Sequence, residues 1–178
     1  MEYVQLISNQ VFEDHRGFFA PLSLKYDDNI RDILKKNWLQ SNISVNPKAG
    51  TLRGLHFQVG EFAQAKLIKV ITGEIADFVV DIREDSPEYM KLHVFEMRPG
   101  DELIVPRGYA HGFITMDTNT VVQYLVDNVY SPQNEGVLSY KEIPELEKRI
   151  KYVFGGGLTI HDKDLITKNI EYGERIDN

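Results

Sequence analysis

The chain contains no cysteine in its 178 residues. This absence excludes disulfide bonds, thiolate metal sites and a thiol nucleophile, and it is typical of proteins from reducing compartments. The sequence also has no apolar run that approaches the roughly 18 residues of a membrane-spanning helix. Its first residues lack the basic start and the apolar stretch of a secretory signal. We therefore expect a cytoplasmic protein that does not enter a membrane.

Basic residues are in the minority, with 20 lysines and arginines against 27 acidic residues and a net charge of −7. Nucleic acids and anionic membrane surfaces attract proteins through clustered positive charge, so neither is an expected partner. A small anionic ligand is compatible with this composition, because a few cations can converge on one site. The length favours a single domain over residues 1–178, with enough chain to bury a sizeable core.

Short segments with β-type composition recur along the whole chain, and turn residues separate several of them. The expected strands are Val4–Ile7, Phe18–Ser23, Trp38–Val45, Lys66–Ile71, Ile75–Ile82, Lys91–Met97, Glu102–Val105, Gly112–Thr115 and Val121–Val126. Many short strands at such spacing are typical of an antiparallel sandwich or barrel. Two peripheral helices are expected, one over Asp28–Lys36 and one over Pro144–Phe154, where a proline opens the helix and three glycines follow it. The predicted class is therefore all-β with a few short helices.

Two segments combine glycine turns with cationic side chains. The first, Gly50–Gln58 followed by Lys66, alternates apolar and polar residues, which places its arginine, its histidine and the lysine on or beside neighbouring strands. The second, Gly100–Phe113, contains a turn, an apolar strand, a Pro-x-Gly turn and then His111. In a barrel or sandwich, such polar groups would point into the mouth, where small-molecule sites usually form.

The spacing of these two segments resembles the two motifs of the cupin superfamily, which implies a jelly-roll sandwich or barrel. A metal-binding cupin would carry a histidine and a glutamate where this chain has Gln58 and Lys66. Glutamine is a poor ligand for transition metals, and an ammonium group repels a divalent ion. We therefore expect neither a metal nor another cofactor. A metal-dependent isomerase or dioxygenase that uses His56 and His111 is the disfavoured alternative.

Within the cupins, several longer motifs resemble one family, the dTDP-4-dehydrorhamnose 3,5-epimerases, and they occur in the same order. These motifs are Asp14–Phe19, Leu52–Gln58, Ala63–Leu67, Gly73–Arg83 and Pro106–Phe113, and a further match returns at Ile160–Asp164. The resemblance implies an isomerase that inverts C3 and C5 of a nucleotide-linked 4-keto sugar without a metal, in the biosynthesis of bacterial surface polysaccharides.

Inversion of a carbon beside a ketone needs a base for the α-proton, an electrophile for the enolate oxygen and an acid on the opposite face. His56 suits the base, because histidine gains and loses a proton near neutral pH. Lys66 suits the electrophile. Tyr124 suits the acid, because it lies on an alternating strand from which it can deliver a proton. The family resemblance implies the same three roles and adds Asp164 as the residue that orients the histidine.

The resemblance also implies a set of substrate-binding residues. They are Arg16, Phe19, Gln40, Asn42, Arg53 and His111. Arg16 matches a residue that contacts the phosphates of the nucleotide. The family is usually dimeric, with N-terminal strands contributed across subunits. The expected partners are therefore a nucleotide-diphosphate 4-keto sugar and a second copy of the chain.

Other interpretations are open at this point. Each histidine suits a structural role, Lys66 suits a solvated strand position, and Tyr124 suits the core; their joint occurrence favours an active site. The chain departs from the family pattern at Ala20–Pro21, at Tyr140 and over Glu145–Phe154. These departures leave a GDP-linked 4-keto heptose, another nucleotide 4-keto sugar, or inversion at C3 alone as alternatives. A non-catalytic sugar-binding module is the remaining class.

Overall fold

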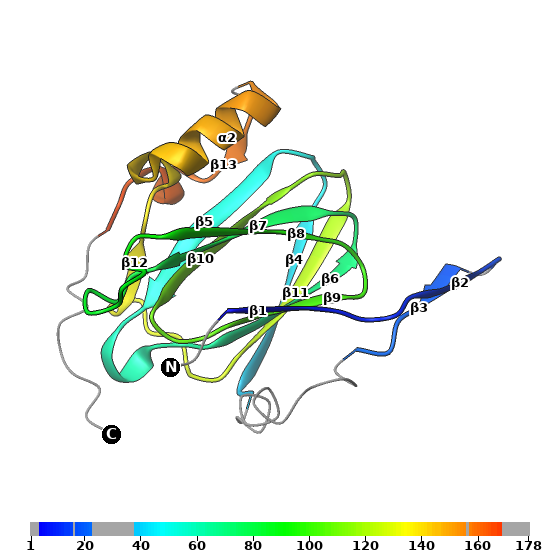
Figure 1. Ribbon diagram of the computed structural model, residues 1–178, viewed down its shortest axis with the longest axis horizontal. Coiled ribbons are helices and arrows are strands. Elements are labelled where there is room, and N and C mark those ends of the chain that lie inside the picture. Colours follow the sequence, from blue (N-terminus) through cyan, green and yellow to red (C-terminus); the bar gives the residue numbers. More distant parts are fainter. Residues whose placement is uncertain (1–3, 16, 23–37, 156, 169–178) are drawn as a thin grey trace.

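The structure is a computed structural model that describes residues 4–15, 17–22, 38–155 and 157–168. Two β-sheets pack face to face (Figure 1). The five-stranded sheet contains, in spatial order, β1 (Gln5–Ser8), β9 (Asp101–Val105), β6 (Lys66–Thr72), β11 (Thr120–Val126) and β4 (Gln40–Asn46). The second sheet contains β12 (Glu135–Val137), β5 (Thr51–Gln58), β10 (Tyr109–Thr115), β7 (Ile75–Asp81) and β8 (Leu92–Met97), with β13 (Thr159–Ile160) paired to β5. The prediction of an all-β sandwich is confirmed.

Helix α2 covers the outer face of the second sheet and spans Pro144–Phe154, the bounds that the sequence predicts. Proline is tolerated in the first turn because its missing N–H has no intrahelical partner there. Gly155 ends the helix with φ 60°, and its N–H donates to the carbonyl of Lys151. Short 3-10 helices are η1 (Gly60–Phe62), η2 (Tyr140–Glu142) and η3 (Asp162–Leu165). The expected helix Asp28–Lys36 lies outside the described residues. No helix in the described ranges has the length and apolarity needed to cross a bilayer.

Alternating side chains of β7 face two hydrophobic clusters. Ile75 and Val79 face the interior between the sheets and pack with residues of β6, β9 and β11. Phe78 faces the other side and packs in a cluster that includes Leu146 of α2. Because side chains of a strand alternate between its two faces, Asp77 shares the interior face with Ile75 and Val79.

The expected strands all have counterparts in the structure, with shifted ends. The strand expected at Phe18–Ser23 corresponds to the shorter β3 (Gly17–Phe19). β10 begins at Tyr109 and not at Gly112, so His111 lies within a strand and not in the preceding turn. The alternation within Gly50–Gln58 predicted that Arg53 and His56 lie on or beside a strand, and β5 confirms this prediction. The short strands β2, β12 and β13 were not predicted.

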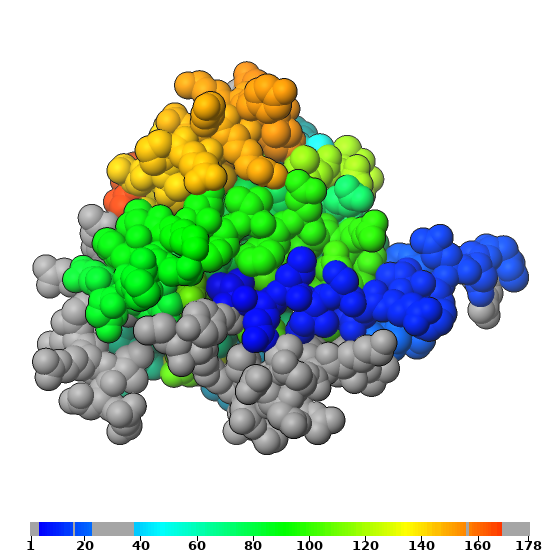
Figure 2. Space-filling model, viewed as in Figure 1, coloured from blue at the N-terminus to red at the C-terminus, as the bar shows by residue number. Residues whose placement is uncertain are grey.

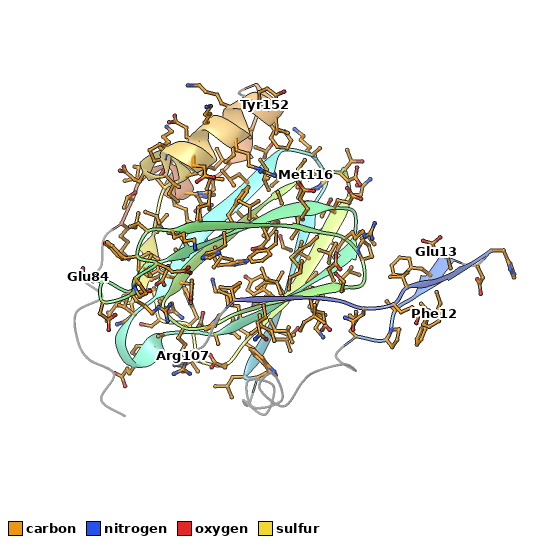
Figure 3. The ribbon with its side chains drawn as sticks, in the orientation of Figure 1. Phe12, Glu13, Glu84, Arg107, Met116 and Tyr152 are labelled. Carbon is orange, nitrogen blue, oxygen red and sulfur yellow. The ribbon has the colours of Figure 1, made fainter. Side chains whose placement is uncertain are left out.

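A hairpin of β2 (Phe12–Asp14) and β3 projects beyond the sandwich as an arm (Figures 1 and 2). Its side chains Phe12, Phe18 and Phe19 are 49%, 50% and 68% exposed, and Figure 3 shows Phe12 on the arm, away from the two sheets. A two-stranded hairpin is at best marginally stable by itself in water. Because its three phenylalanine side chains are exposed, the arm presents an apolar surface that the described part of this chain does not cover.

Candidate active site

A cavity of about 850 Å³ lies between the strands and the C-terminal segment. It is lined by residues of both sheets and of η3, and a smaller space of about 120 Å³ shares part of its wall. The residues that line both spaces are His56, Lys66, Tyr124, Tyr130 and Glu135. Three of the four predicted catalytic residues are in this shared set, and the fourth, Asp164, lines the larger cavity.

His56 is held by the C-terminal segment of the chain. The parallel pairing of β13 with β5 places η3, which contains Asp164, beside it. Asp164 Oδ1 lies 2.7 Å from His56 Nε2, and Oδ2 accepts a hydrogen bond from the Gly54 N–H at 3.1 Å. Burial raises the pKa of Asp164, but the hydrogen bonds from His56 and Gly54 outweigh it and hold this pKa below its usual value. A charged carboxylate at Nε2 favours the tautomer with the proton on that atom and leaves Nδ1 as the basic atom.

Gly54 makes this arrangement possible. Its φ of 102° is a conformation that favours glycine, and a Cβ at this position would lie 2.7 Å from the carbonyl oxygen of His111. A side chain would therefore separate β5 from β10 and withdraw the N–H that Asp164 binds. The glycine that interrupts the strand pattern in the sequence is thus part of the site.

Lys66 enters the cavity from β6, in the sheet opposite His56. It is 9% exposed, and its Nζ donates to the backbone carbonyl of His56 at 3.0 Å. Burial lowers the pKa of Lys66 to about 8, although the charges of Asp77 and Glu135 raise it. The side chain is therefore mainly an ammonium at neutral pH, and a desolvated cation stabilises a developing anion more strongly than a solvated one.

Tyr124 reaches the cavity from β11, where Asn42 of β4 is its cross-strand neighbour. Burial raises the pKa of Tyr124, and the nearby Arg53 opposes this rise. The phenol therefore keeps its proton at neutral pH and is able to act as an acid. Since His56 belongs to the other sheet, the candidate base and the candidate acid approach the cavity from opposite sheets.

His111 lies on β10 directly beside His56 in the sheet register. Its Nε2 lies 2.9 Å from Oδ2 of Asp77, and both residues are buried. Burial lowers the pKa of His111, although Asp77 raises it. The site therefore contains two His–Asp pairs side by side, of which the sequence analysis anticipated only the first.

The remaining predicted contacts divide into two groups. Arg53 lines the larger cavity, where its Nε donates to Asn46 Oδ1 at 2.8 Å. Gln40 and Asn42 line the smaller space and are hydrogen-bonded to each other at 2.6 Å. Phe19, in contrast, lies on the arm and is not among the residues that line either space. Arg16 lies outside the described residues.

A family model described as dTDP-4-dehydrorhamnose 3,5-epimerase matches residues 1–171. The chain belongs to this family. The dTDP-4-dehydrorhamnose 3,5-epimerase of Sinorhizobium fredii is 37% identical over 143 residues, which cover 78% of this chain and 72% of the relative. The prediction of an isomerase that acts on carbohydrates is confirmed by this membership.

Solved structures of the family have the same fold. The enzyme from Bacillus anthracis, with TDP and PPi bound, has a TM-score of 0.74 and 34% identity, and the match covers 94% of each chain. The enzyme from Legionella pneumophila, in complex with dTDP-4-keto-L-rhamnose, has a TM-score of 0.75 and 28% identity over 90% of this chain and 84% of that one. These similarities confirm the cupin-type sandwich.

The side-chain amide of Gln58 is engaged at both of its ends. Its Oε1 accepts from the Ser131 N–H at 2.7 Å, and its Nε2 donates to the Val129 carbonyl at 3.4 Å. Both ends of the amide therefore fix the loop after β11. In the ranges that the structure describes, no three His, Asp or Glu side chains are grouped to hold a metal ion.

Four titratable residues of the cavity wall were not predicted as site residues from the sequence, namely Tyr130, Glu135, His161 and Lys163. Tyr130 donates to Glu135 Oε2 at 2.9 Å, and both lie at or after an irregular loop that has no spacing pattern. His161 and Lys163 flank Asp162, and Nδ1 of His161 accepts from the Lys163 N–H at 3.2 Å at the start of η3. The sequence signal for His161 and Lys163 was their closeness to the predicted Asp164.

Proposed function

We propose that this chain inverts C3 and C5 of dTDP-4-keto-6-deoxyglucose through enolate intermediates, as a step in the synthesis of a sugar for surface polysaccharides. The observation that carries the proposal is the buried Lys66 ammonium, which shares one cavity with the His56–Asp164 pair and with Tyr124. The names of the relatives, and the TDP and dTDP-4-keto-L-rhamnose bound in two similar structures, support this substrate.

His56 acts as the base. Its Nδ1 removes the proton from C5 or C3, and the electron pair of that C–H bond moves into the bond to C4 and onto the ketone oxygen. The imidazolium that forms is stabilised by Asp164, whose carboxylate is 2.7 Å from Nε2. The carboxylate keeps its charge throughout, because its role is to orient and stabilise the ring.

Lys66 acts as the electrophile for the oxygen that becomes negative. An ammonium fixed by a hydrogen bond to the His56 carbonyl needs little reorganisation when charge develops beside it. Removal of one preorganised donor of this kind typically costs about 10²–10³ in kcat. The interaction grows as the enolate forms, so it accelerates the proton transfer and does not only tighten binding.

Tyr124 acts as the acid. It donates its hydroxyl proton to the carbon from the face opposite the base, the C4 ketone re-forms, and the configuration at that carbon is inverted. The phenolate and the imidazolium then return to their starting states by exchange with solvent. A second cycle at the other carbon beside the ketone completes the double inversion.

The substrate is held by residues that surround this set. Arg53 contacts the diphosphate as a charge-assisted partner, and Gln40, Asn42 and His111 contact the sugar nucleotide. These residues line the two connected spaces, which supports the assignment.

We further infer that the working unit is a dimer of single-domain chains. The family match over residues 1–171 supports one domain. The apolar arm, with Phe12, Phe18 and Phe19 at least about half exposed, supports a second copy as the surface that covers it. In such a dimer, Phe19 and Arg16 complete the site of the partner. Sedimentation of wild type and of a Phe12→Ser/Phe19→Ser double variant tests this inference: loss of the dimer is expected in the variant, and a monomeric wild type contradicts it.

The proposed function is tested by incubating the purified protein with dTDP-4-keto-6-deoxyglucose and, separately, with a GDP-linked 4-keto heptose. Proton NMR coupling constants of the products report the configuration at each carbon. We expect inversion at C3 and C5 of the dTDP sugar only. Inversion at C3 alone would redefine the enzyme as a 3-epimerase, turnover of the GDP sugar alone would replace the substrate, and no reaction with either would overturn the proposal.

A further inference from the structure

A carboxylate that the mechanism above does not use lies behind the wall of the site, next to His111. Asp77 on β7 is fully buried, and its Oδ2 lies 2.9 Å from His111 Nε2. Its other oxygen, Oδ1, is also buried and has no hydrogen-bond partner among the residues that the structure describes. A buried carboxylate with one unsatisfied oxygen is costly, so its presence calls for a compensating charge or a function.

The surroundings of Asp77 are otherwise apolar. Its neighbours on the same face of β7 are Ile75 and Val79, and the residue opposite it on β10 is Phe113; all three belong to the core between the sheets. His111 is hydrogen-bonded to this carboxylate, and the charge of Lys66 also lowers the pKa of Asp77, although the two form no direct ion pair among the described residues. His111 and Lys66 both line the cavity, whereas Asp77 lies behind them.

We propose that Asp77 is a positioning residue that serves as the buried counter-ion of the Lys66 ammonium and holds His111 through its Nε2 atom, so that Nδ1 is the ring atom left for the substrate. This inference rests on the proposed function and adds to it the residue that keeps the electrophile charged. An ammonium without a counter-ion in this environment would lose its proton, and a neutral amine stabilises an enolate far less.

The electrostatics of the cluster support the proposal. Burial lowers the pKa of Lys66 to about 8, and Asp77 is the strongest of the charges that raise it, ahead of Glu135 on β12. Burial holds the pKa of Asp77 above its usual value, although His111 and Lys66 lower it. The other titratable groups around Lys66 are His56 on β5, whose carbonyl binds Nζ, and Tyr124 on β11, which keeps its proton.

The test is Asp77→Asn, which removes the charge and keeps an oxygen that accepts from His111 Nε2. Two readouts are needed across pH 6 to 9.5, namely kcat/KM for epimerisation and the ¹⁵N NMR titration of Lys66 Nζ, assigned with Lys66→Met. We expect both the alkaline limb of kcat/KM and the Nζ titration to move to lower pH by about one unit or more, the usual effect of losing an opposite charge nearby. Asp77→Asn should therefore be least impaired near pH 6.5 and most impaired above pH 8.

Asp81→Asn is the matched control. Asp81 is also fully buried on β7, but its carboxylate accepts from Arg83 and Ser86, and it does not line the cavity. The control should lower the melting temperature without moving the Lys66 titration. An Asp77→Asn enzyme whose alkaline limb and Nζ titration coincide with those of wild type would overturn the proposal.

Two further outcomes are distinguishable. If the wild type turns over neither sugar, the proposed function fails, while the Nζ titration of the two proteins still decides whether Asp77 is the counter-ion. If Asp77→Asn does not fold, the comparison with this variant is replaced by the ¹³C NMR titration of the Asp77 carboxyl carbon in the wild type. The proposal then requires an ionised carboxylate where the enzyme is active, and a protonated carboxyl across that range contradicts it.

Discussion

The carboxylate of Asp164 lies 2.7 Å from Nε2 of His56, although 108 positions separate the two residues in the chain. The same carboxylate accepts from the Gly54 N–H through its other oxygen, so both oxygens are engaged. This double engagement fixes the carboxylate in one orientation and, through it, the imidazole.

Asp164→Asn should therefore impair catalysis severely while preserving the shape of the site. An asparagine has only one acceptor oxygen, so its amide NH₂ must face either the Gly54 N–H or His56 Nε2. The first is a donor–donor contact, and the second forces the imidazole into the wrong tautomer. We expect kcat to fall by about 10³–10⁴-fold, as for comparable His–Asp pairs. Solvent-deuterium exchange rates at matched circular dichroism measure the effect, and a loss below tenfold would argue against an orienting role.

Lys66→Met should remove the electrophile and keep most of the side-chain volume. Because the ammonium interacts with the enolate oxygen more strongly than with the ketone, the loss should appear in kcat, by about 10²–10³-fold. Lys141→Met, at an exposed position of η2, is the matched control and should have wild-type kinetics. Steady-state kinetics decide the point, since a rise in KM at constant kcat would assign Lys66 to binding alone.

The pH dependence of the wild type follows from the same residue. The ammonium is present below a pKa of about 8 and is lost as the pH rises through that value, so kcat/KM should decline above about pH 8. The fold holds this pKa below the ordinary 10.5, so folding favours the neutral amine, and the Lys66 contribution to the free energy of unfolding increases between pH 8 and 10.5. Activity should thus decline near pH 8.5 without loss of thermal stability. A simultaneous fall of the melting temperature would attribute the decline to unfolding.

Tyr124→Phe should separate proton exchange from inversion. The base and the electrophile stay in place, so the substrate still exchanges protons for deuterons in D₂O, but the deuteron returns mainly from the side of His56. We expect deuterium at C3 and C5 with retained configuration and little inverted product. Tyr152→Phe, at a position on α2 that is 91% exposed (Figure 3), should behave as wild type. Parallel loss of exchange and inversion in Tyr124→Phe would contradict its role as the acid.

Arg53→Met should weaken substrate binding more than chemistry. A charge-assisted hydrogen bond to a phosphate contributes about 1.5–3 kcal/mol, so KM should rise roughly 10–100-fold with a small change in kcat. Arg149→Met removes an exposed arginine of α2 that pairs with Glu96 of β8 and does not line the cavity, so it should leave KM unchanged. Unaltered KM in the Arg53 variant would remove this residue from the diphosphate site.

Much of this architecture was predictable because local chemistry determines it. Helix α2 follows from Pro144 at its start and Gly155 just after its end, and the strands follow from their alternation and their turns. The pairing of Asp164 with His56 depends on a two-residue parallel strand, β13, whose sequence carries no pattern, so only the family resemblance could suggest it. Asp77 and Tyr130 were missed because their roles arise from packing between distant strands. The pKa of Lys66 depends on burial and on charges from other strands, and no local spacing encodes it.

The central claim is that His56 removes the protons at both carbons beside the ketone. Proton NMR of dTDP-4-keto-6-deoxyglucose in D₂O with wild type and with His56→Asn tests it most directly. We expect the H3 and H5 signals to disappear with wild type and to persist with a folded His56→Asn protein. Exchange at either carbon by the variant, at a rate near that of wild type, would show that another base removes that proton and would contradict the role of His56.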